Sequence, residues 1–481
     1  MRAYLKSARG LSDEEITYLA RTGFDIQKRQ REHARTDPII QRAIGRSVKD
    51  FRDIFKAAVK PPRFLQGGVY GITALMTLPG VPSPVVAKFT ESPSTAECTK
   101  DVSRMVCRTV GGKRCGDYVW TGNTRADREI AIHGFVSAVE EMGASPHFLH
   151  TYLGAPIELQ QRVSIQQVAK WLGAPAAKVK KYGASNIRTL NVSVLEYGGS
   201  PMPDLIKKII SKHSVPTCVS MMRSAMAQIL QAITTMVAVG NLHHNDLHVE
   251  NILGSITAAP FLYYQVILTS RKGRGGASTS VEEAERRARA NKAGTTSRLF
   301  KVPTHGFMWR VIDFGHATST DLFGDDDHAI MARSAFGGPV WPGAVGRSAK
   351  TMPLELFDAA RFLDNVTSEV SCLPREAKGI LRKDIDVVIT GAERMAKQLR
   401  DTLPLSAVQR LQELTTGDLG TPARLSKVKE EIAKLKAASA DHGLMVETFM
   451  AAAQRFGFEV NDEDVRTEMT EENLYVLSID V

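Results

Sequence analysis

The stretch NLHHNDLHVENILGS, residues 241–255, places three histidines, two acids and three asparagines between two apolar segments. Asp246 precedes Asn251 by five residues on an expected loop, so both side chains can point into one cleft. An aspartate there can accept the proton of a hydroxyl, and an asparagine carbonyl can ligate a hard divalent cation. A further acid, Asp313, ends the β-like run MWRVID just before a Phe-Gly pair. We expect Asn251 and Asp313 to hold magnesium against phosphates; the alternative is a polar loop with incidental histidines.

A second group of residues lies in the first 130 residues of the chain. Gly68 and Gly71 in QGGVYG fall between two expected strands, where backbone N–H groups can approach phosphates closely. Lys88 ends the apolar run PVVAK, and a cation among apolar neighbours needs a partner. Glu129, on the next expected helix, can be that partner. A common glycine-rich hairpin and a surface lysine at a strand end are the alternatives.

The elements that must position these residues follow from hydrophobic periodicity and breakers. Residues 11–60 are expected to be helical, and GGVYGITALMTL and PVVAKF to be two strands. Then come a helix at 126–142, a strand near 149–153, two short helices in 164–183, a buried strand in 191–199 and a strand in MWRVIDFG. One long helix should end at Gly240 and present an apolar face of Met222, Met226, Ile229, Ile233 and Met236. Beyond about residue 350 we expect only helices, with periodic segments at 374–403, 405–414 and 424–456. The order predicts an α+β fold with strands first and a helical body second, and with the chemistry at their junction.

Length and composition limit the classes of protein. A chain of 481 residues exceeds one typical core, so at least two packed units are expected. The net charge of +10 is spread along the chain and does not by itself support nucleic-acid binding. No run of 18 apolar residues and no secretory signal are present, so we expect a soluble protein without a membrane span. Five scattered cysteines fit a reducing, intracellular compartment rather than a disulfide framework.

Taken in order, these motifs resemble the protein-kinase-like superfamily across most of residues 61–370. QGGVYG resembles the glycine-rich loop, VVAKF the strand lysine, REIAIHGF the helix with the paired acid, and VLEYGG the hinge. HNDLHVEN resembles the catalytic loop and DFG the magnesium loop. SPHF and HNDLH are also similar to the corresponding motifs of divergent kinases of large DNA viruses. The expected fold is therefore two-lobed, with N- and C-terminal helical extensions.

The resemblance also implies roles for single residues, with ATP and Mg²⁺ as cofactors. Lys88 would bind the α- and β-phosphates and pair with Glu129, under a lid that includes Gly68 and Gly71. Asp246 would be the catalytic base, and Asn251 and Asp313 would hold the metal. The backbone of Glu196, Tyr197 and Gly198 would meet adenine, with Leu195 behind it. Asp358 in ELFDAARFL would be the acid that anchors the catalytic loop.

The chain departs from the family pattern at four places. Gln66 replaces the first glycine of the lid, and Asn245 replaces an arginine that docks a phosphorylated activation loop in many regulated kinases. His248 stands where protein kinases usually have lysine, which is also similar to aminoglycoside and choline-type phosphotransferases. MPLE at 352–355 is a poor match to the alanine-proline-glutamate motif.

The expected domain organisation has four parts. They are a helical extension at 1–60, a small lobe at 61–199 with inserts near 90–124 and 160–188, a large lobe at 200–400, and a helical extension at 401–481. A polar, disordered insert at 270–298 would explain why Asn251 and Asp313 are far apart in the sequence. Two further motifs were weighed. Cys98, Cys107 and Cys115 do not have the spacing of paired zinc ligands, and the helix pair at 164–183 is better explained as an insert than as a helix-turn-helix module.

Three hypotheses follow. The first is an ATP- and magnesium-dependent kinase, divergent and of viral type, that phosphorylates serine or threonine in a protein. The second is a small-molecule phosphotransferase of the same fold. The third is a catalytically inactive kinase-like structural protein. Retention of Lys88, Glu129, Asp246, Asn251 and Asp313 argues against the third, because inactive relatives usually lose at least one such group.

Overall fold

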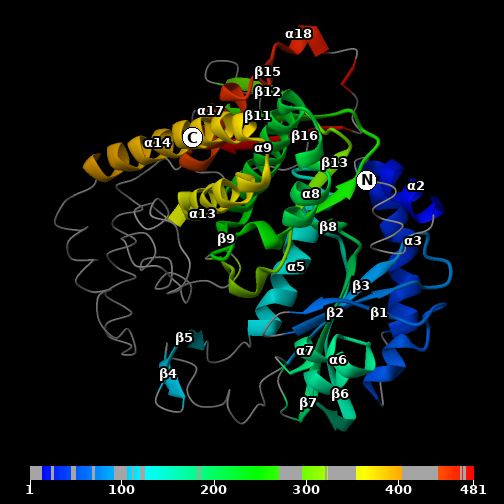
Figure 1. Cartoon of the computed structure of the whole chain (residues 1–481). Coiled ribbons are helices and arrows are strands. Elements are labelled where there is room, and N and C mark those ends of the chain that lie inside the picture. The colour runs from blue at the N-terminus through cyan, green and yellow to red at the C-terminus, as the bar shows by residue number, and fades with distance from the viewer. Residues whose placement is uncertain are drawn as a thin grey trace. The chain divides into compact units, whose positions relative to one another are not determined.

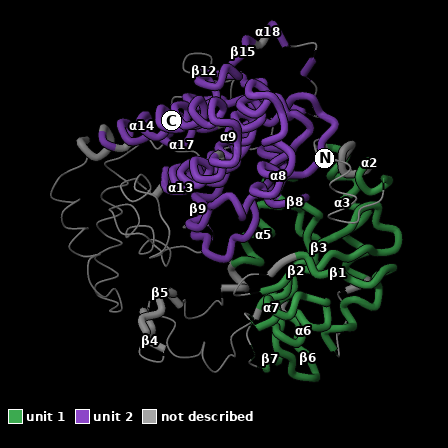
Figure 2. The backbone as a smooth tube through the Cα atoms, viewed as in Figure 1, with its two compact units in different colours: residues 1–103, 119–141, 149–198 green, residues 104–118, 142–148, 199–481 purple. Residues whose placement is uncertain are grey.

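The computed structural model divides the chain into two compact units, which Figure 2 shows in different colours. Unit 1 contains residues 1–103, 119–141 and 149–198, and unit 2 contains residues 104–118, 142–148 and 199–481. The structure describes residues 13–22, 26–44, 50–67, 71–91, 106–110, 113–119, 125–180, 182, 184, 186–269, 295–319, 322, 354–402, 443–465, 468–469 and 473–480. One boundary between the units falls between Gly198 and Gly199.

A five-stranded antiparallel sheet in the order β1-β2-β3-β7-β6 organises unit 1 (Figure 1). Its strands are β1 Arg63–Gly67, β2 Gly71–Met76, β3 Val85–Glu91, β6 Thr151–Val163 and β7 Ile187–Glu196. On β3, Val85, Ala87 and Phe89 are fully buried, whereas the alternate residues Val86 and Lys88 are partly exposed. This two-residue alternation is what a half-buried strand requires, and it puts the Lys88 side chain on the face away from the core.

Several helices of unit 1 pack against this sheet, and the helices of the unit include those that the sequence predicted. They are α2 Asp13–Thr22, α3 Ile26–Ile44, the 3₁₀ turn η1 Phe51–Phe55, α5 Arg125–Glu141, α6 Ile165–Trp171 and α7 Ala176–Val179. Ser164 caps α6 through a reciprocal pair of hydrogen bonds with Gln167 (2.8 and 3.1 Å). Because Ile165, Val168 and Ala169 belong to the core of the sheet, this helix pair packs as part of unit 1.

Unit 2 is built around a 26-residue helix, α9 Val215–Gly240. All five residues of its predicted apolar face are buried. The left-handed residue that ends the helix is Asn241 (φ 43°), one position after the glycine that the sequence favoured. The other helices of unit 2 are α8 Met202–Lys208, η2 Ile210–Lys212, η3 Val249–Asn251, η4 Phe314–His316, α13 Leu354–Glu369, η6 Val370–Cys372, α14 Arg375–Thr402, α17 Leu444–Arg455 and α18 Asp462–Val465.

The strands of unit 2 form small sheets. A three-stranded sheet joins β8 Ser200–Pro201, β10 Ile252–Ile256 and β13 Phe307–Val311, and a two-stranded sheet joins β9 Leu242–His243 to β14 Thr318–Ser319. A four-stranded sheet has the order β15-β12-β11-β16, with β11 Phe261–Thr269, β12 Thr295–Pro303, β15 Glu459–Val460 and β16 Leu474–Asp480. Strands β4 Val106–Val110 and β5 Lys113–Val119 pair within the expected insert at 90–124.

One glycine in unit 2 is required by its surroundings. Gly199 has φ +100°, and a Cβ atom there would lie 2.1 Å from the carbonyl oxygen of Gly254. No other residue type can occupy this position without moving the backbone of β10. Gly199, the second glycine of the expected hinge motif VLEYGG, is therefore required by close packing against β10.

The four-stranded sheet corrects two expectations. The C-terminal region was expected to be only helical, but β15 and β16 are strands, and β16 pairs in parallel with β11. The insert was expected at 270–298, but residues 295–298 belong to β12, which pairs with β11 along its whole length. Two long strands, and not only a polar loop, therefore account for the distance between Asn251 and Asp313. Residues 270–294, and the helices expected within 403–442, lie outside the described residues.

Among the helices of the described residues, none is both long enough and apolar enough to cross a membrane.

Candidate functional site

The first cluster of expected site residues lies in unit 1. Lys88 is paired in register with Thr73 of β2 and Ser193 of β7, so β3 is a central strand. The Nζ of Lys88 donates a hydrogen bond to Oε1 of Glu129 on α5, as the sequence predicted. The Lys88 side chain is 17% exposed and that of Glu129 is 8% exposed, so each charge needs the other. His133, one turn further along α5, lies with Nε2 3.5 Å from the same carboxylate oxygen.

The expected glycine-rich lid is described at its two ends. Gln66 and Gly67 of β1 pair with Thr73 and Ile72 of β2, so the hairpin predicted by the sequence is present. Gly68 lies outside the described residues. A Cβ atom at Gly71 would lie 2.5 Å from the carbonyl oxygen of Phe89, so close packing against β3 requires this glycine. The glycine at 71 therefore has a structural reason that does not depend on a nucleotide.

The expected hinge residues Leu195, Glu196 and Tyr197 are all buried. The backbone N–H of Glu196 donates to the carbonyl of His150 (2.9 Å), which commits it to the sheet. Its carboxylate accepts a hydrogen bond from Nη2 of Arg29 on α3 (2.6 Å), and Nη1 of Arg29 lies 2.9 Å from Oε1 of Glu140 on α5. The buried guanidinium of Arg29 thus joins α3 to α5 and to the end of β7. The sequence analysis did not identify Arg29.

The second cluster lies in unit 2, on the loop between α9 and β10. Its anchor is Asp358 on α13, whose carboxylate accepts hydrogen bonds from the backbone N–H groups of His244 (2.6 Å) and Asn245 (2.8 Å). Asp358 therefore holds this loop, as expected of an anchoring acid. Burial raises the pKa of Asp358, while His244, the two N–H groups and Arg361 act in the opposite direction. Asn245 adopts a left-handed conformation (φ 62°), and its amide Nδ2 donates to Oγ1 of Thr318 (2.9 Å).

Asp246 is positioned by three neighbours in the same unit. Nη2 of Arg361 on α13 donates to its Oδ1, and Nη1 of Arg361 donates to the carbonyl of Asn245 (2.9 Å). Nδ2 of Asn251 donates to the backbone carbonyl of Asp246 (2.9 Å), which orients the amide oxygen of Asn251. His248 lies with Nε2 3.8 Å from Oδ2 of Asp246, and burial lowers the pKa of this imidazole. The permanent cation beside Asp246 is therefore Arg361 and not the residue two positions after it.

The pairing of two strands brings Asn251 and Asp313 together. In the antiparallel pair β10–β13, Ile252 is the register partner of Val311, and the N–H of Ile312 donates to the carbonyl of Asn251 (3.0 Å). Asp313 follows directly, in a left-handed conformation (φ 67°), and is exposed. A non-glycine residue in this conformation costs on the order of 1–3 kcal/mol, and such strain clusters at functional sites. Two oxygen-bearing side chains from distant parts of the sequence therefore lie on neighbouring chain segments.

Arg361 is the residue of this cluster that the sequence analysis missed. It follows Asp358 by three positions in ELFDAARFL, and residues three apart lie on one face of a helix. Once Asp358 is assigned to the loop, this spacing would have placed Arg361 beside the same loop. Cys98, Cys107 and Cys115, whose spacing argued against a zinc site, have side chains outside those that the structure describes.

No protein-family model and no curated protein matches this chain. The two clusters of side chains, one in each unit, are therefore the features from which a function can be inferred.

Proposed function

We propose that this chain is an ATP- and magnesium-dependent phosphotransferase of the two-lobed, protein-kinase-like type, which transfers the γ-phosphate of ATP to a serine or threonine hydroxyl of a protein. One observation supports this most. Asp358 and Arg361 hold the loop that carries Asp246, and the β10–β13 register brings Asn251 next to Asp313. A structural role alone does not require a base and two oxygen ligands on neighbouring segments.

In this proposal unit 1 binds the nucleotide. Lys88, held by Glu129, contacts the α- and β-phosphates, and the carbonyl of Glu196 with the backbone of Tyr197 and Gly198 meets adenine. The ion pair between Lys88 and the buried carboxylate of Glu129 supports the proposed role of Lys88 in phosphate binding, because the pair fixes the position of the ammonium group.

Unit 2 supplies the residues that act on the transferred group. Asn251 and Asp313 offer an amide oxygen and a carboxylate, and Mg²⁺ prefers such hard oxygen ligands. Bound there, Mg²⁺ would neutralise charge on the phosphates. Asp246 accepts the proton of the attacking hydroxyl, and Arg361 keeps its carboxylate in place. The chain thus contributes mainly positioning and electrostatic stabilisation.

The choice of a protein acceptor depends on the resemblance of the DFG, hinge and HNDLH motifs to protein kinases. Asp246 needs only a hydroxyl within hydrogen-bond reach, so it accepts either acceptor class. A lowered pKa leaves His248 neutral over more of the pH range than an ordinary histidine. His248 therefore does not supply the permanent positive charge that a lysine supplies at this position in protein kinases. For this reason a small-molecule acceptor stays the alternative.

The test is phosphate transfer from labelled ATP with Mg²⁺ by the purified full chain. A basic test protein and a panel of small alcohols and aminoglycosides are offered separately. We expect phosphoserine or phosphothreonine with the wild type and its loss with Asp246→Asn. Asp204→Asn is the matched control, because that aspartate of α8 has a 40% exposed side chain and forms an ion pair with Lys208, four residues further along the same helix. Labelling of a small alcohol alone would support the second hypothesis, and no transfer to either class would support an inactive protein.

A further inference from the structure

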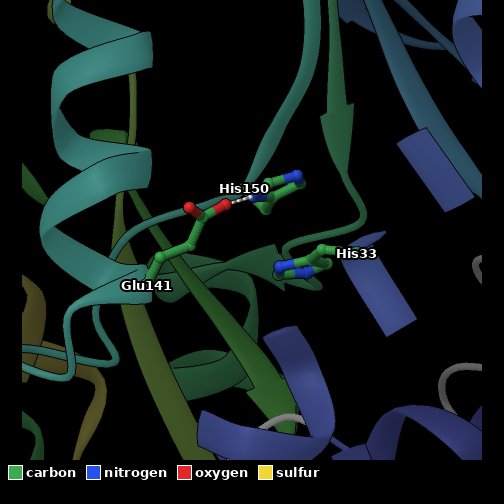
Figure 3. Close-up of side chains that lie close together, drawn as sticks. All are labelled: His33, Glu141 and His150. Atoms are coloured by element: carbon green, nitrogen blue, oxygen red, sulfur yellow. Dashed lines mark ion pairs between the residues drawn. The ribbon is translucent and has the colours of Figure 1, made fainter. Parts of the chain in front are cut away.

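Three side chains of unit 1 that can bind a metal ion lie close together, and they are other residues than Lys88 and Glu129. His33 comes from α3, Glu141 is the last residue of α5, and His150 directly precedes β6 (Figure 3). One ligand atom from each lies within 4.8 Å of the others. The two histidines are 5% and 3% exposed, whereas the Glu141 side chain is 42% exposed. The cluster is therefore buried on its histidine side and open to solvent at the carboxylate.

We propose that His33, Glu141 and His150 form a binding site for one divalent transition-metal ion, with Zn²⁺ as the best-suited ion. Two imidazoles and one carboxylate are a common donor set for zinc, which leaves a fourth position for water. The exposed side of Glu141 gives the ion a path from solvent. This inference does not depend on the proposed phosphotransferase activity.

The hydrogen bonds around His150 support this assignment. Its Nδ1 lies 2.9 Å from Oε1 of Glu141, and its Nε2 lies 3.1 Å from Oδ1 of Asp37. A metal-binding histidine almost always donates its other ring N–H to a carboxylate or carbonyl, which fixes the tautomer and the ring orientation. Asp37 is in that position if Nδ1 is the ligand atom. The Ser137 hydroxyl, 2.9 Å from the same Nδ1, would then lie beside the bound ion.

A neutral imidazole carries one N–H and one lone pair on its two ring nitrogens. His150 can therefore donate from Nε2 to Asp37 and at the same time offer the lone pair of Nδ1 to a metal ion on the side of Glu141.

Ion binding requires a small rearrangement. The rings of His33 and His150 are stacked, with centroids 3.7 Å apart and an interplanar angle of 11°. The lone pairs of an imidazole lie in the plane of the ring, so two nearly parallel rings with centroids 3.7 Å apart cannot both direct a lone pair at one ion. A tetrahedral zinc ion with bonds of about 2.0–2.1 Å holds its ligand atoms about 3.3 Å apart. We therefore expect His33 to turn out of the stack and Glu141 to close over the ion, while Asp37 retains His150.

Such a site would fasten three elements that are distant in the sequence. Asp37 and His33 are four residues apart on α3, so this helix supplies one ligand, His33, and the carboxylate that orients a second ligand, His150. Glu141 ends the helix that carries Glu129, and His150 begins β6. The bound ion would add a link between α3 and α5 to the one that Arg29 makes with Glu140.

The experiment uses the full chain, freed of metal with a chelator, and Zn²⁺ alone as the probe. Isothermal titration should show one ion bound per chain, and the melting temperature should rise. The Co²⁺-substituted protein should have the electronic spectrum of a nitrogen- and oxygen-ligated ion, without thiolate charge-transfer bands, which excludes binding by the cysteines. Thiolate bands, or no binding of either ion, would overturn the proposal and leave a hydrogen-bonded cluster only.

Substitutions locate the site. Glu141→Gln and His33→Gln should abolish stoichiometric binding, and Asp37→Asn should weaken it by about 10- to 100-fold. Glu141→Gln is the decisive variant. Because the Glu141 side chain is 42% exposed, we expect the metal-free variant to have the melting temperature of the metal-free wild type. His213→Gln, at an exposed histidine of unit 2, is the control and should bind zinc normally. Unchanged binding by Glu141→Gln and His33→Gln would place the ion elsewhere.

Discussion

Arg361 offers the sharpest test of how this chain holds Asp246. Arg361→Met removes a guanidinium that is 5% exposed and that donates to both Asp246 and the carbonyl of Asn245. A hydrogen bond that involves a charged group contributes about 1.5–3 kcal/mol. Methionine fills much of the space of the arginine stem and offsets part of this loss. We expect the free energy of unfolding to fall by about 2–4 kcal/mol.

The same substitution should act on the chemical step. Asn245 holds a left-handed backbone conformation directly before Asp246, and without Arg361 this strained segment can relax. A displacement of about 1 Å of a catalytic group can reduce the rate by about 10²-fold. We therefore expect kcat to fall by about 100-fold, with little change in the KM for ATP. Arg361→Lys keeps the charge but cannot make both contacts, so it should give an intermediate rate.

The assay is steady-state phosphate transfer, combined with denaturant unfolding of the same preparations. Arg382→Met is the control, because this arginine of α14 is exposed. A near wild-type kcat in Arg361→Met would refute the positioning role, whatever the change in stability. A fall in kcat explained entirely by the unfolded fraction would refute it as well.

Three further predictions concern other parts of the chain. Lys88→Met should remove ATP turnover and leave the circular dichroism spectrum of the folded protein intact, and turnover near the wild-type rate would exclude Lys88 from phosphate binding. Replacement of residues 270–294 by a short Gly/Ser bridge between two paired strand ends should leave the melting temperature unchanged, because this segment contains few large apolar side chains. Extending that deletion to residue 298 should lower the melting temperature, because it removes paired residues of β12, and equal melting of the two deletions would contradict the β11–β12 register. Removal of residues 474–480 should destabilise unit 2 by about 3–6 kcal/mol in denaturant unfolding, because it deletes two buried aliphatic side chains of β16, Val476 and Leu477. An unchanged unfolding curve would show that β16 does not belong to the fold.

Local patterns in the sequence determined much of the secondary structure. The methionine and isoleucine face of α9 and the alternation in PVVAKF are set by neighbours within a few residues, so helix and strand periods reveal them. The capped helix after Ser164 was predictable for the same reason. The residue types around Asp246 and Asp313 also predict general-base and metal-binding chemistry, and these roles stay predictions.

Contacts between distant residues were decided only by tertiary structure. Asn251 and Asp313 meet because β10 and β13 pair, and β16 was missed because a seven-residue strand beside an acidic segment carries little periodic signal. Its partner, β11, lies more than 200 residues earlier in the chain, and neither segment predicts the other.

Helix α3 shows most clearly that the sequence alone does not determine long-range contacts. Arg29, His33 and Asp37 lie four residues apart on α3 and look, in the sequence, like ordinary polar positions of a basic helix. Only packing brings them to Glu196, Glu141 and His150. A helix period fixes which side chains share a face, but what that face meets depends on how the whole chain buries its apolar surface.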